Sequence, residues 1–314
     1  MVITRNIPGL EEALQDLPPE WSVWVNPRDE ASEDDLIEEI ENCTGLLCVN
    51  IPITERTFRA ARRLRVVSNY GVGVDHIDLE AAKAHGVAVA NLPDEVTYST
   101  AEMAMALMLA CVRRIGEADR FMRKTGGFPP PGQEIRGNNL RGKTLGLLGF
   151  GRIGQTVGRM AGAFGMKLIY HARRRRTEAE EELDAAYRDL PALLREADVL
   201  SIHVPGGEGT RHLVGREELA QMRPSAVLIN TARGTVVDEQ ALVEALRSGK
   251  LKAAGLDVYE REPELTPGLT ELENVVLAPH IGTSTWETRL EMTKGALRNL
   301  AAALQGRQPS SRVV

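Results

Sequence analysis

Hydrophobic residues follow two alternating patterns along the chain. Short runs rich in valine, leucine and isoleucine are typical of buried strands, and longer segments with apolar residues at helical spacing separate them. In the first part of the chain we expect strands at Gly45–Val49, Arg65–Ser68 and Val87–Ala90. A helix is expected over Leu79–His85, and Gly86 would end it. This alternation predicts βαβ units and a parallel sheet.

A long apolar helix is expected to follow this first part. Ser99 and Glu102 have the spacing of a capping box, and the helix would run from Met103 to about Ala118. It is apolar on nearly every face, so we expect it to be buried between two packed bodies. The next segment, Gly126–Gly132, consists of glycine and proline around one phenylalanine and predicts an irregular connection.

Strand patterns recur in the rest of the chain. Helical patterns separate most of them, which is typical of a doubly wound dinucleotide fold with one sheet of about six strands. The expected strands are Thr144–Leu148, Lys167–Tyr170, Val199–His203, Ala226–Asn230, Ala253–Asp257 and Val275–Leu277. The last segment, Ser284–Gln305, is helical again and no strand follows it, so it can return to cover the first body.

A glycine-rich loop directly after one predicted strand is the first sign of a ligand. Gly149, Gly151 and Gly154 form the pattern G-x-G-x-x-G between this strand and a predicted helix over Gln155–Phe164. The first glycine permits a tight turn, the second lets the backbone approach a pyrophosphate, and the third lets helix and strand pack closely. The helix N-terminus adds free N–H groups and a positive dipole end. A turn without a ligand is the alternative, but the flanking strand and helix favour dinucleotide binding.

The end of the next strand indicates which dinucleotide is bound. An NAD site has an acidic residue about 20 residues after the glycines, which binds the ribose 2′-hydroxyl. Here the strand Leu168–Tyr170 is followed by the arginines 173–176 and by no carboxylate at that position. Arginine binds phosphate in a bidentate fork, so the pattern favours NADP over NAD, with Arg173 and Arg174 nearest the strand end. The alternative is a solvated basic loop that pairs with the acidic run after it, and some of the arginines are expected to do so.

Three polar residues form a candidate catalytic group. Arg233, Glu262 and His280 each come a few residues after a different predicted strand. Ligands of open α/β sheets bind outside the carboxyl ends of the strands, so all three point at one crevice. An arginine can hold a carboxylate and polarise a carbonyl, and a histidine can transfer the proton that accompanies a hydride. A carboxylate bonded to this histidine would raise its pKa and keep it an acid near neutral pH. Each residue alone is more simply a surface or loop side chain, but together they favour catalysis.

These segments together resemble the D-isomer-specific 2-hydroxyacid dehydrogenases over essentially the full chain. The order and spacing of several motifs carry the resemblance: Asn69–Asp78, Gly86–Pro93, Gly149–Gly154, Asn230–Gly234, Gly255–Pro263 and Pro279–Gly282. The family's catalytic residues fall on Arg233, Glu262 and His280. The segment 170–173 is more similar to the NADPH-preferring glyoxylate and hydroxypyruvate reductases than to the NAD-using phosphoglycerate dehydrogenases.

The resemblance implies further roles for residues of this chain. The backbone amides of Val72 and Gly73 would bind the substrate carboxylate, with Arg233 and His280 completing the substrate site. Asp257 would bind the nicotinamide carboxamide. The full set of implied cofactor-binding residues is Thr100, Gly149, Gly151, Arg152, Ile153, Gly154, Arg173, Arg174, Val204, Pro205, Thr210, Thr231, Ala232, Asp257, His280 and Gly282.

The resemblance also implies a domain arrangement. A doubly wound (Rossmann) dinucleotide-binding domain over 99–284 would be inserted into a smaller, flavodoxin-like substrate-binding domain made of 1–98 and 285–314. The family further implies a homodimer, with the apolar helix after Ser99 as a candidate contributor.

Length and composition agree with a globular protein of two domains. The chain has 314 residues, and 38 basic against 44 acidic side chains give a formal net charge of −6. This charge provides no footprint for nucleic acid or an anionic membrane, and the longest apolar run, Met103–Val112, is too short to span a bilayer. The cysteines Cys43, Cys48 and Cys111 predict no disulfide framework and no metal site, so a reducing cytoplasm is the default location.

We therefore expect an NADPH-dependent reductase that converts glyoxylate or hydroxypyruvate to a D-2-hydroxy acid. Two alternatives remain open. One is a dehydrogenase of another substrate, such as 3-phosphoglycerate or phosphite. A phosphorylated substrate would need extra cations near Ile51–Ile53, which has none, although Arg56 and Arg59 lie close in the sequence. A non-catalytic module that senses NADP on the same fold is the other, and the intact Arg, Glu and His argue against it.

Overall fold

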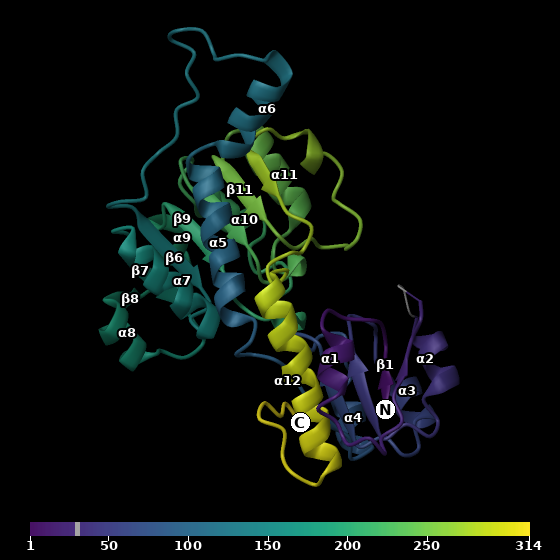
Figure 1. The fold of residues 1–314 in the computed structure, drawn as a ribbon. Helices are drawn as coiled ribbons and strands as arrows, with labels where there is room; N and C mark the ends of the chain where they lie inside the picture. The colour runs from purple at the N-terminus through teal and green to yellow at the C-terminus, as the bar shows by residue number, and fades with distance from the viewer. Residues whose placement is uncertain (29–31) are drawn as a thin grey trace. The chain divides into compact units, whose positions relative to one another are not determined.

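The computed structural model describes residues 1–28 and 32–314, which form two compact units. Met1–Val96 and Thr283–Val314 make the first unit, and Thr97–Gly282 makes the second. Both divisions lie two residues earlier in the chain than the expected 98/99 and 284/285. Each unit is a parallel sheet with helices on both of its faces (Figure 1). The expected α/β class is confirmed.

The first unit contains a five-stranded parallel sheet in the order β2-β1-β3-β4-β5. This order is that of flavodoxin-like folds, as expected. The strands are β1 (Val2–Ile3), β2 (Trp24–Val25), β3 (Gly45–Cys48), β4 (Val66–Asn69) and β5 (Ala88–Ala90). The helices are α1 (Leu10–Leu14), α2 (Glu33–Glu39), α3 (Glu55–Ala60), α4 (Leu79–Ala84) and α12 (Trp286–Leu304). The sequence patterns did not predict β1 and β2, because two-residue strands are too short to show a period.

The last helix of the chain belongs to this first unit. Met292 and Leu300 of α12 are buried in the same core as Leu47 of β3, and the Ser68 hydroxyl donates to the Ala296 carbonyl at 3.0 Å. The opposite face of the sheet is covered by α2, α3 and α4. Residues far apart in the sequence therefore build one core, as the helical pattern at the end of the chain suggested.

The second unit contains a seven-stranded parallel sheet in the order β12-β11-β10-β9-β6-β7-β8. Its strands are β6 (Thr144–Leu148), β7 (Lys167–His171), β8 (Ala185–Tyr187), β9 (Val199–Ile202), β10 (Val227–Asn230), β11 (Ala253–Leu256) and β12 (Val275–Leu277). All six predicted strands are present within a residue or two, and β8 is an additional edge strand. The chain passes from β6 to β7 and β8 on one side and then returns to place β9 on the other. A ligand crevice is expected at such a reversal.

Helices cover both faces of this sheet. α9 (Leu190–Glu196), α10 (Arg216–Gln221) and α11 (Glu239–Arg247) share one core cluster, and α5 (Thr97–Val112) and α7 (Arg152–Ala163) share the other. A further short helix, α8 (Thr177–Leu183), packs beside α7 and β8. Because the strands are buried on both faces, their sequences are nearly continuous apolar runs.

The long apolar helix differs from the prediction at both ends. α5 begins at Thr97, so Ser99 lies within its first turn, only 6% exposed, and does not cap it. The predicted capping box was wrong because the chain already turns over 93–96, and a cap must lie outside the helix. The predicted single helix is also two helices, since Arg114 adopts a left-handed conformation (φ 55°) between them.

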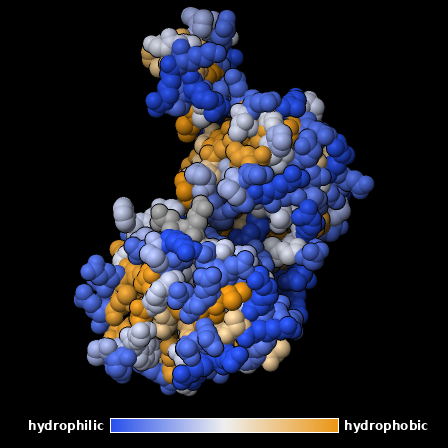
Figure 2. Space-filling view, turned by 90° about the vertical axis from the view of Figure 1, so that its right-hand side faces the viewer, coloured by the Kyte–Doolittle hydropathy of each residue, from blue (hydrophilic) through white to orange (hydrophobic). Residues whose placement is uncertain are grey.

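The second of these helices stands apart from the core. α6 (Ile115–Thr125) has no buried residue, whereas most of α5 is buried against the sheet. α6 and the irregular segment after it project from the rest of the second unit (Figure 1). Figure 2 shows hydrophobic residues gathered at the base of this projection.

Two features are absent from the residues that the structure describes. No helix is long and apolar enough to cross a membrane. No group of three or more histidine, cysteine or acidic side chains is placed to hold a metal ion.

Candidate active site

The glycine-rich loop lies at the carboxyl end of β6, where the strand order reverses. Gly149 has φ +99°, and a Cβ on it would lie 2.6 Å from the carbonyl carbon of His203, so only glycine fits. A Cβ on Gly154 would lie 2.3 Å from the Gly149 carbonyl oxygen, whereas one on Gly151 would meet open space. The backbone at Gly151, the N-cap of α7, is therefore open to a ligand. The loop fits the pyrophosphate of a dinucleotide.

The arginines after β7 divide into two groups. Arg175 donates from Nε to Glu180 Oε1 at 3.0 Å, and its guanidinium lies over the Tyr187 ring, 5.6 Å from the centroid. The hydrogen bonds from Arg175 and from the Tyr170 hydroxyl lower the pKa of Glu180 to about 2. In contrast, the exposed side chains of Arg173 and Arg174 have no hydrogen bond or ion pair with any described residue. These two guanidinium groups remain available to a phosphate.

Arg233, Glu262 and His280 come together at the carboxyl ends of β10, β11 and β12. Glu262 Oε2 lies 2.8 Å from His280 Nδ1, and Glu262 Oε1 accepts from the Tyr259 N–H at 3.0 Å. A carboxylate can only accept, so the bond assigns a proton to Nδ1. His280 Nε2 has no partner among the described residues, and the side chain is 46% exposed. Nε2 is therefore the atom that can exchange a proton with a ligand.

The charges in this group favour an ionised Glu262. Burial raises the pKa of Glu262, but the hydrogen bonds from His280 and Tyr259 and the charges of His280 and Arg233 outweigh burial and hold the pKa below its ordinary value. Arg233 is fixed at the end of β10, where its carbonyl accepts from Asn230 Nδ2 at 2.9 Å. The group thus combines a cation, a carboxylate and an imidazole.

Asp257 shapes the turn that carries His280. It is 1% exposed, and its two oxygens accept from the N–H groups of Ile281 and Gly282 at 2.8 and 2.7 Å. This turn holds His280 at φ +54°, a conformation that non-glycine residues rarely adopt. A Cβ on Gly282 would lie 2.9 Å from Asp257 Oδ2 and 4.0 Å from Thr100 Oγ1. The structure therefore brings Thr100, Asp257 and Gly282 together.

The other predicted cofactor residues lie just after strand ends, at the start of α7 or, in the case of Thr210, in a short 3-10 turn after β9: Arg152, Ile153, Val204, Pro205, Thr210, Thr231 and Ala232. The Thr210 hydroxyl donates to the Pro205 carbonyl at 2.7 Å and closes the turn after β9. Thr231 Oγ1 is buried without a hydrogen-bond partner among the described residues. A buried hydroxyl without a partner costs about 1–3 kcal/mol. A polar ligand group beside Thr231 would remove this cost, so the residue fits a bound cofactor.

In the first unit, the loop at Val72 and Gly73 has the form of an anion site. Asn69 Nδ2 donates to the carbonyls of Gly71 and Gly73 at 3.0 and 2.8 Å, and Asn91 Nδ2 donates to the Val72 carbonyl at 2.8 Å. The N–H groups of Val72 and Gly73 make no hydrogen bond with another described residue. Adjacent free N–H groups form a concavity that binds anions. The loop is therefore suited to a carboxylate.

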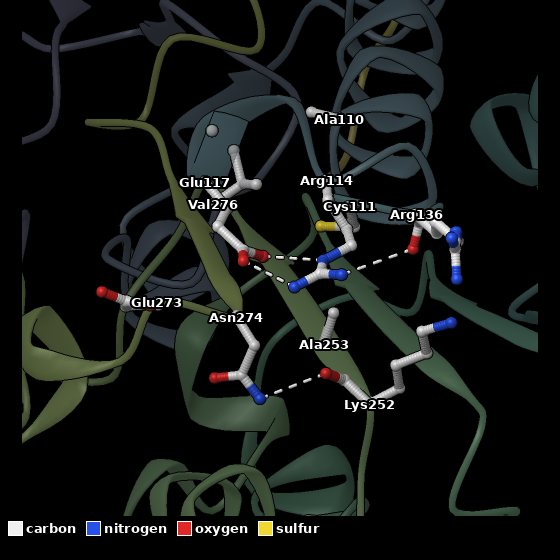
Figure 3. A pocket seen from close by; sticks show the side chains of 11 residues that line it. Ala110, Cys111, Arg114, Glu117, Arg136, Lys252, Ala253, Glu273, Asn274 and Val276 are labelled. Carbon is white, nitrogen blue, oxygen red and sulfur yellow. Dashed lines mark hydrogen bonds and ion pairs between the residues drawn. The ribbon is translucent and has the colours of Figure 1, made fainter. Parts of the chain in front are cut away.

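A cavity of about 290 Å³ lies at the amino ends of β11 and β12, whereas the candidate site lies at the carboxyl ends of the strands. Figure 3 shows that Arg114 and Asn274, two of its polar residues, bind other residues of the lining. Arg114 donates to the Glu117 carboxylate and the Arg136 carbonyl, and Asn274 donates to the Lys252 carbonyl. Open parallel sheets bind ligands at the carboxyl ends of their strands. We therefore exclude this cavity from the candidate site.

The NAD-binding domain of the D-isomer-specific 2-hydroxyacid dehydrogenases matches residues 105–282 of this chain. The chain belongs to this family. It is 42% identical to a glyoxylate reductase of Thermococcus litoralis over 99% of this chain and 95% of that protein. As a D-2-hydroxyacid dehydrogenase it is an oxidoreductase of the CH–OH group with an NAD(P)-binding domain.

Solved structures agree with this assignment. A protein of Thermus thermophilus has a TM-score of 0.92 and 41% identity, covering 100% of this chain and 99% of that one. An NADPH-dependent glyoxylate/hydroxypyruvate reductase from Sinorhizobium meliloti, solved in complex with NADP and malonate, has a TM-score of 0.86 and 32% identity, covering 100% and 96%.

Arg56 and Arg59, the two cations that could favour a phosphorylated substrate, both have acidic partners. Arg56 Nη2 lies 2.6 Å from Asp34 Oδ1, and Arg59 Nε lies 2.8 Å from Glu55 Oε1. The local charge is balanced there, which weighs against a dedicated phosphate site in this dehydrogenase.

The sequence did not indicate two buried residues that hydrogen-bond to the loops of the site, Asn69 and Glu239. Asn69 is the first residue of a motif, and an asparagine shortly before a glycine turn is a known turn signal. Glu239 carries no signal in the sequence, because an acidic residue in the first turn of a helix is usually solvated. Both are 2% exposed in the structure. No local pattern reveals that burial.

Proposed function

We propose that this dehydrogenase works as a reductase of small 2-oxo acids, with glyoxylate and hydroxypyruvate as leading substrates, and forms D-2-hydroxy acids with NADPH. The observation that carries the proposal is the 2.8 Å hydrogen bond between Glu262 Oε2 and His280 Nδ1 beside Arg233. The names of the Thermococcus litoralis and Sinorhizobium meliloti relatives support the substrate class.

In this proposal the side chains divide the chemistry among them. A reduced nicotinamide dinucleotide, held by the glycine loop and Asp257, would supply a hydride for the keto carbon when bound. His280 donates its Nε2 proton to the oxygen, which becomes the hydroxyl group, and Glu262 stabilises the imidazolium before the transfer. Arg233 binds the substrate, and its positive charge stabilises the negative charge that develops on the keto oxygen. The amides of Val72 and Gly73 bind the substrate carboxylate.

The preference for NADPH is proposed from Arg173 and Arg174. Both guanidinium groups are exposed and unpaired among the described residues, and both follow the strand β7 closely. No acidic residue stands at the end of this strand to repel a 2′-phosphate. Arginine forks suit that phosphate, and the Sinorhizobium meliloti relative is described as NADPH-dependent.

We also propose a homodimer in which α6 and the segment 126–139 contact a second copy. The exposed fractions are 55% for Ile115, 40% for Met122 and 87% for Phe128. Exposed apolar patches rimmed by polar residues mark protein–protein interfaces. The sequence suggested the apolar helix from Met103 to about Ala118 as contributor. Most of that stretch belongs to α5, which is largely buried within its own unit, so α6 is the better candidate. Three free, buried cysteines support a reducing cytoplasm as the location.

Initial rates test the proposed activity. NADPH and NADH are each measured against glyoxylate, hydroxypyruvate, pyruvate and a phosphorylated analogue. We expect the highest kcat/KM for glyoxylate or hydroxypyruvate with NADPH, and a D-configured product wherever a stereocentre forms. A preference for the phosphorylated analogue would refute the substrate assignment. Binding of NADPH without its oxidation by any acid would indicate a non-catalytic module.

A further inference from the structure

The second unit contains a buried carboxylate for which the proposed chemistry has no role. Glu239 is the first residue of α11, and 2% of it is exposed. Burial raises the pKa of Glu239, because a buried carboxylate is costly unless its oxygens are hydrogen-bonded. The hydrogen bonds of Glu239 therefore identify what it stabilises.

Both oxygens of Glu239 bind the segment that carries Glu262. Oε1 accepts from the Glu260 N–H at 2.8 Å, and Oε2 accepts from the Thr266 hydroxyl at 2.6 Å. The two donors lie on either side of Glu262 in the sequence. One carboxylate thus holds the segment 259–266 at two points.

The same segment packs on the residue that follows Arg233. A Cβ on Gly234 would lie 1.8 Å from the carbonyl carbon of Tyr259, so the two backbones are in direct contact. The Tyr259 N–H donates to Glu262 Oε1, which leaves Oε2 for His280. The place of Glu262 beside His280 therefore depends on how this segment is held.

No cation offsets the charge of Glu239 directly among the described residues. Glu260 and Glu262 both oppose its ionisation, and Arg211 and His212 bond to the side chain of Glu260 instead. What favours the carboxylate is its pair of hydrogen bonds and the positive end of the α11 dipole. A carboxylate without a cation partner is suited to hold its two donors, the Glu260 N–H and the Thr266 hydroxyl, in place.

We propose that Glu239 is a positioning residue for Glu262: it holds the segment 259–266 so that the Glu262 carboxylate meets His280. The catalytic role of the Glu262–His280 pair rests on the proposed function, but the contacts of Glu239 involve neither substrate nor cofactor. The variant Glu239→Gln tests the idea because its single carbonyl oxygen can accept from only one of the two donors.

Steady-state kinetics give the first measurement. We expect Glu239→Gln to lower kcat by roughly 10- to 100-fold, because a misplacement of about 1 Å near the chemistry can cost 10²-fold. The KM values for glyoxylate and NADPH should stay close to wild type. The matched control is Glu244→Gln, on the same helix but paired with Arg216 at the surface, and it should leave kcat unchanged. If Glu239→Gln fails to fold, Thr266→Val removes one of the two donors and should give a smaller loss of the same kind.

A double variant separates positioning from general stability. If Glu239 acts through Glu262, its loss should have no further effect on kcat in the Glu262→Gln background. Losses that multiply in the double variant would overturn the proposal, because Glu239 would then act independently of Glu262.

Crystal structures provide a readout that does not need activity. In Glu239→Gln we expect the segment 259–266 to shift and the 2.8 Å contact between Glu262 and His280 to lengthen. An unchanged segment and contact would overturn the proposal. A wild-type protein that reduces no 2-oxo acid would refute the proposed function, and the structural comparison would still decide the role of Glu239.

Discussion

His280 differs from the other histidines that contact a glutamate in the described part of the chain. His85 Nε2 shares Glu55 with Arg59, and His212 Nε2 shares Glu260 with Arg211. His280 instead bonds through Nδ1 and leaves Nε2 directed at no other residue of the described chain. A histidine beside a glutamate is therefore not enough for this chemistry, and the geometry that leaves Nε2 without a partner is what distinguishes His280.

The first prediction concerns this histidine. His280→Ala should lower kcat by roughly 10²–10⁴-fold, the usual contribution of a general acid. His85→Ala removes a comparable histidine–glutamate contact in the other unit and should leave kcat near wild type. Stopped-flow and steady-state rates with NADPH and glyoxylate measure both. Near-normal turnover of His280→Ala would remove His280 from the mechanism.

The second prediction separates the arginines after β7. Replacing Arg173 and Arg174 together with alanine should raise the KM for NADPH by roughly 10- to 100-fold, since a hydrogen bond to a charged group contributes about 1.5–3 kcal/mol. The KM for NADH should change little. Arg175→Ala is the control: it breaks the contacts with Glu180 and Tyr187 but should preserve the preference for NADPH. Equal losses for both coenzymes in the double variant would contradict the 2′-phosphate assignment.

The third prediction concerns stability against pH. Folding lowers the pKa of Glu180 from its ordinary value of 4.5 to about 2, so the folded state keeps the carboxylate ionised where the unfolded chain takes up a proton. The stabilisation is complete above pH 4.5 and is lost as the pH falls towards 2. Glu180→Gln should therefore lower Tm at pH 7, and the difference from wild type should shrink below pH 4.5. Thermal melts across this range measure it, and a difference that persists at the acid end would show another cause.

At the scale of elements, the site is built from the connections that leave neighbouring parallel strands. The connection after β10 carries Arg233, the one after β11 carries Glu262, and the one after β12 carries His280. Each is tied to the next: Gly234 packs on Tyr259, and Asp257 binds the turn at Ile281. The strands place the connections at one edge, and these contacts set the distances between side chains.

The fourth prediction follows from the tightest of these contacts. Gly234→Ala should lower both Tm and kcat, because the added Cβ would lie 1.8 Å from the Tyr259 carbonyl carbon. Overpacking of this kind costs about 1–3 kcal/mol. Gly209→Ala is the matched control, since a Cβ there would meet no atom within 4 Å. Calorimetry and initial rates compare the two, and a Gly234→Ala variant equal to Gly209→Ala would show that the connections can separate freely.

At the scale of the whole molecule, one projection carries apolar side chains that the described chain leaves exposed. The apolar residues of α6 and Phe128 are exposed, although the rest of the second unit buries most of its large apolar residues in two clusters. A specific dimer interface buries about 1,200–2,000 Å² in total. A projecting helix with a neighbouring apolar surface is suited to bury such an area against a second copy.

The fifth prediction is a dimer that depends on this projection. Sedimentation velocity should find two copies for the wild type and one for a variant with Ile115→Lys and Met122→Lys. Phe164→Ser, an exposed phenylalanine at the end of α7, should stay dimeric. A monomeric wild type, or a dimer that survives both lysines, would contradict the proposed interface.

The sequence alone determined the fold class, the glycine loop, the run of arginines and the three residues at the strand ends. These features depend on local signals: buried parallel strands are continuous apolar runs, and a glycine loop between strand and helix has few other uses. The sequence could not predict β1 and β2, whose two residues are too few to show a pattern, or the edge strand β8, which is only partly buried. It also placed the start of α5 wrongly, because Ser99 and Glu102 have the spacing of a cap whether or not the chain turns earlier.

Only the tertiary structure decided which arginine is paired with another side chain and which carboxylate is buried. Arg175 and Arg174 are neighbours of the same type, and they differ because Glu180 and Tyr187 lie beside only one of them. Glu239 is equivalent in its sequence to a solvated helix-start residue, and it is buried because a segment from the next connection folds over it. Such differences arise from contacts between segments distant in the sequence, and no local pattern of residues contains them.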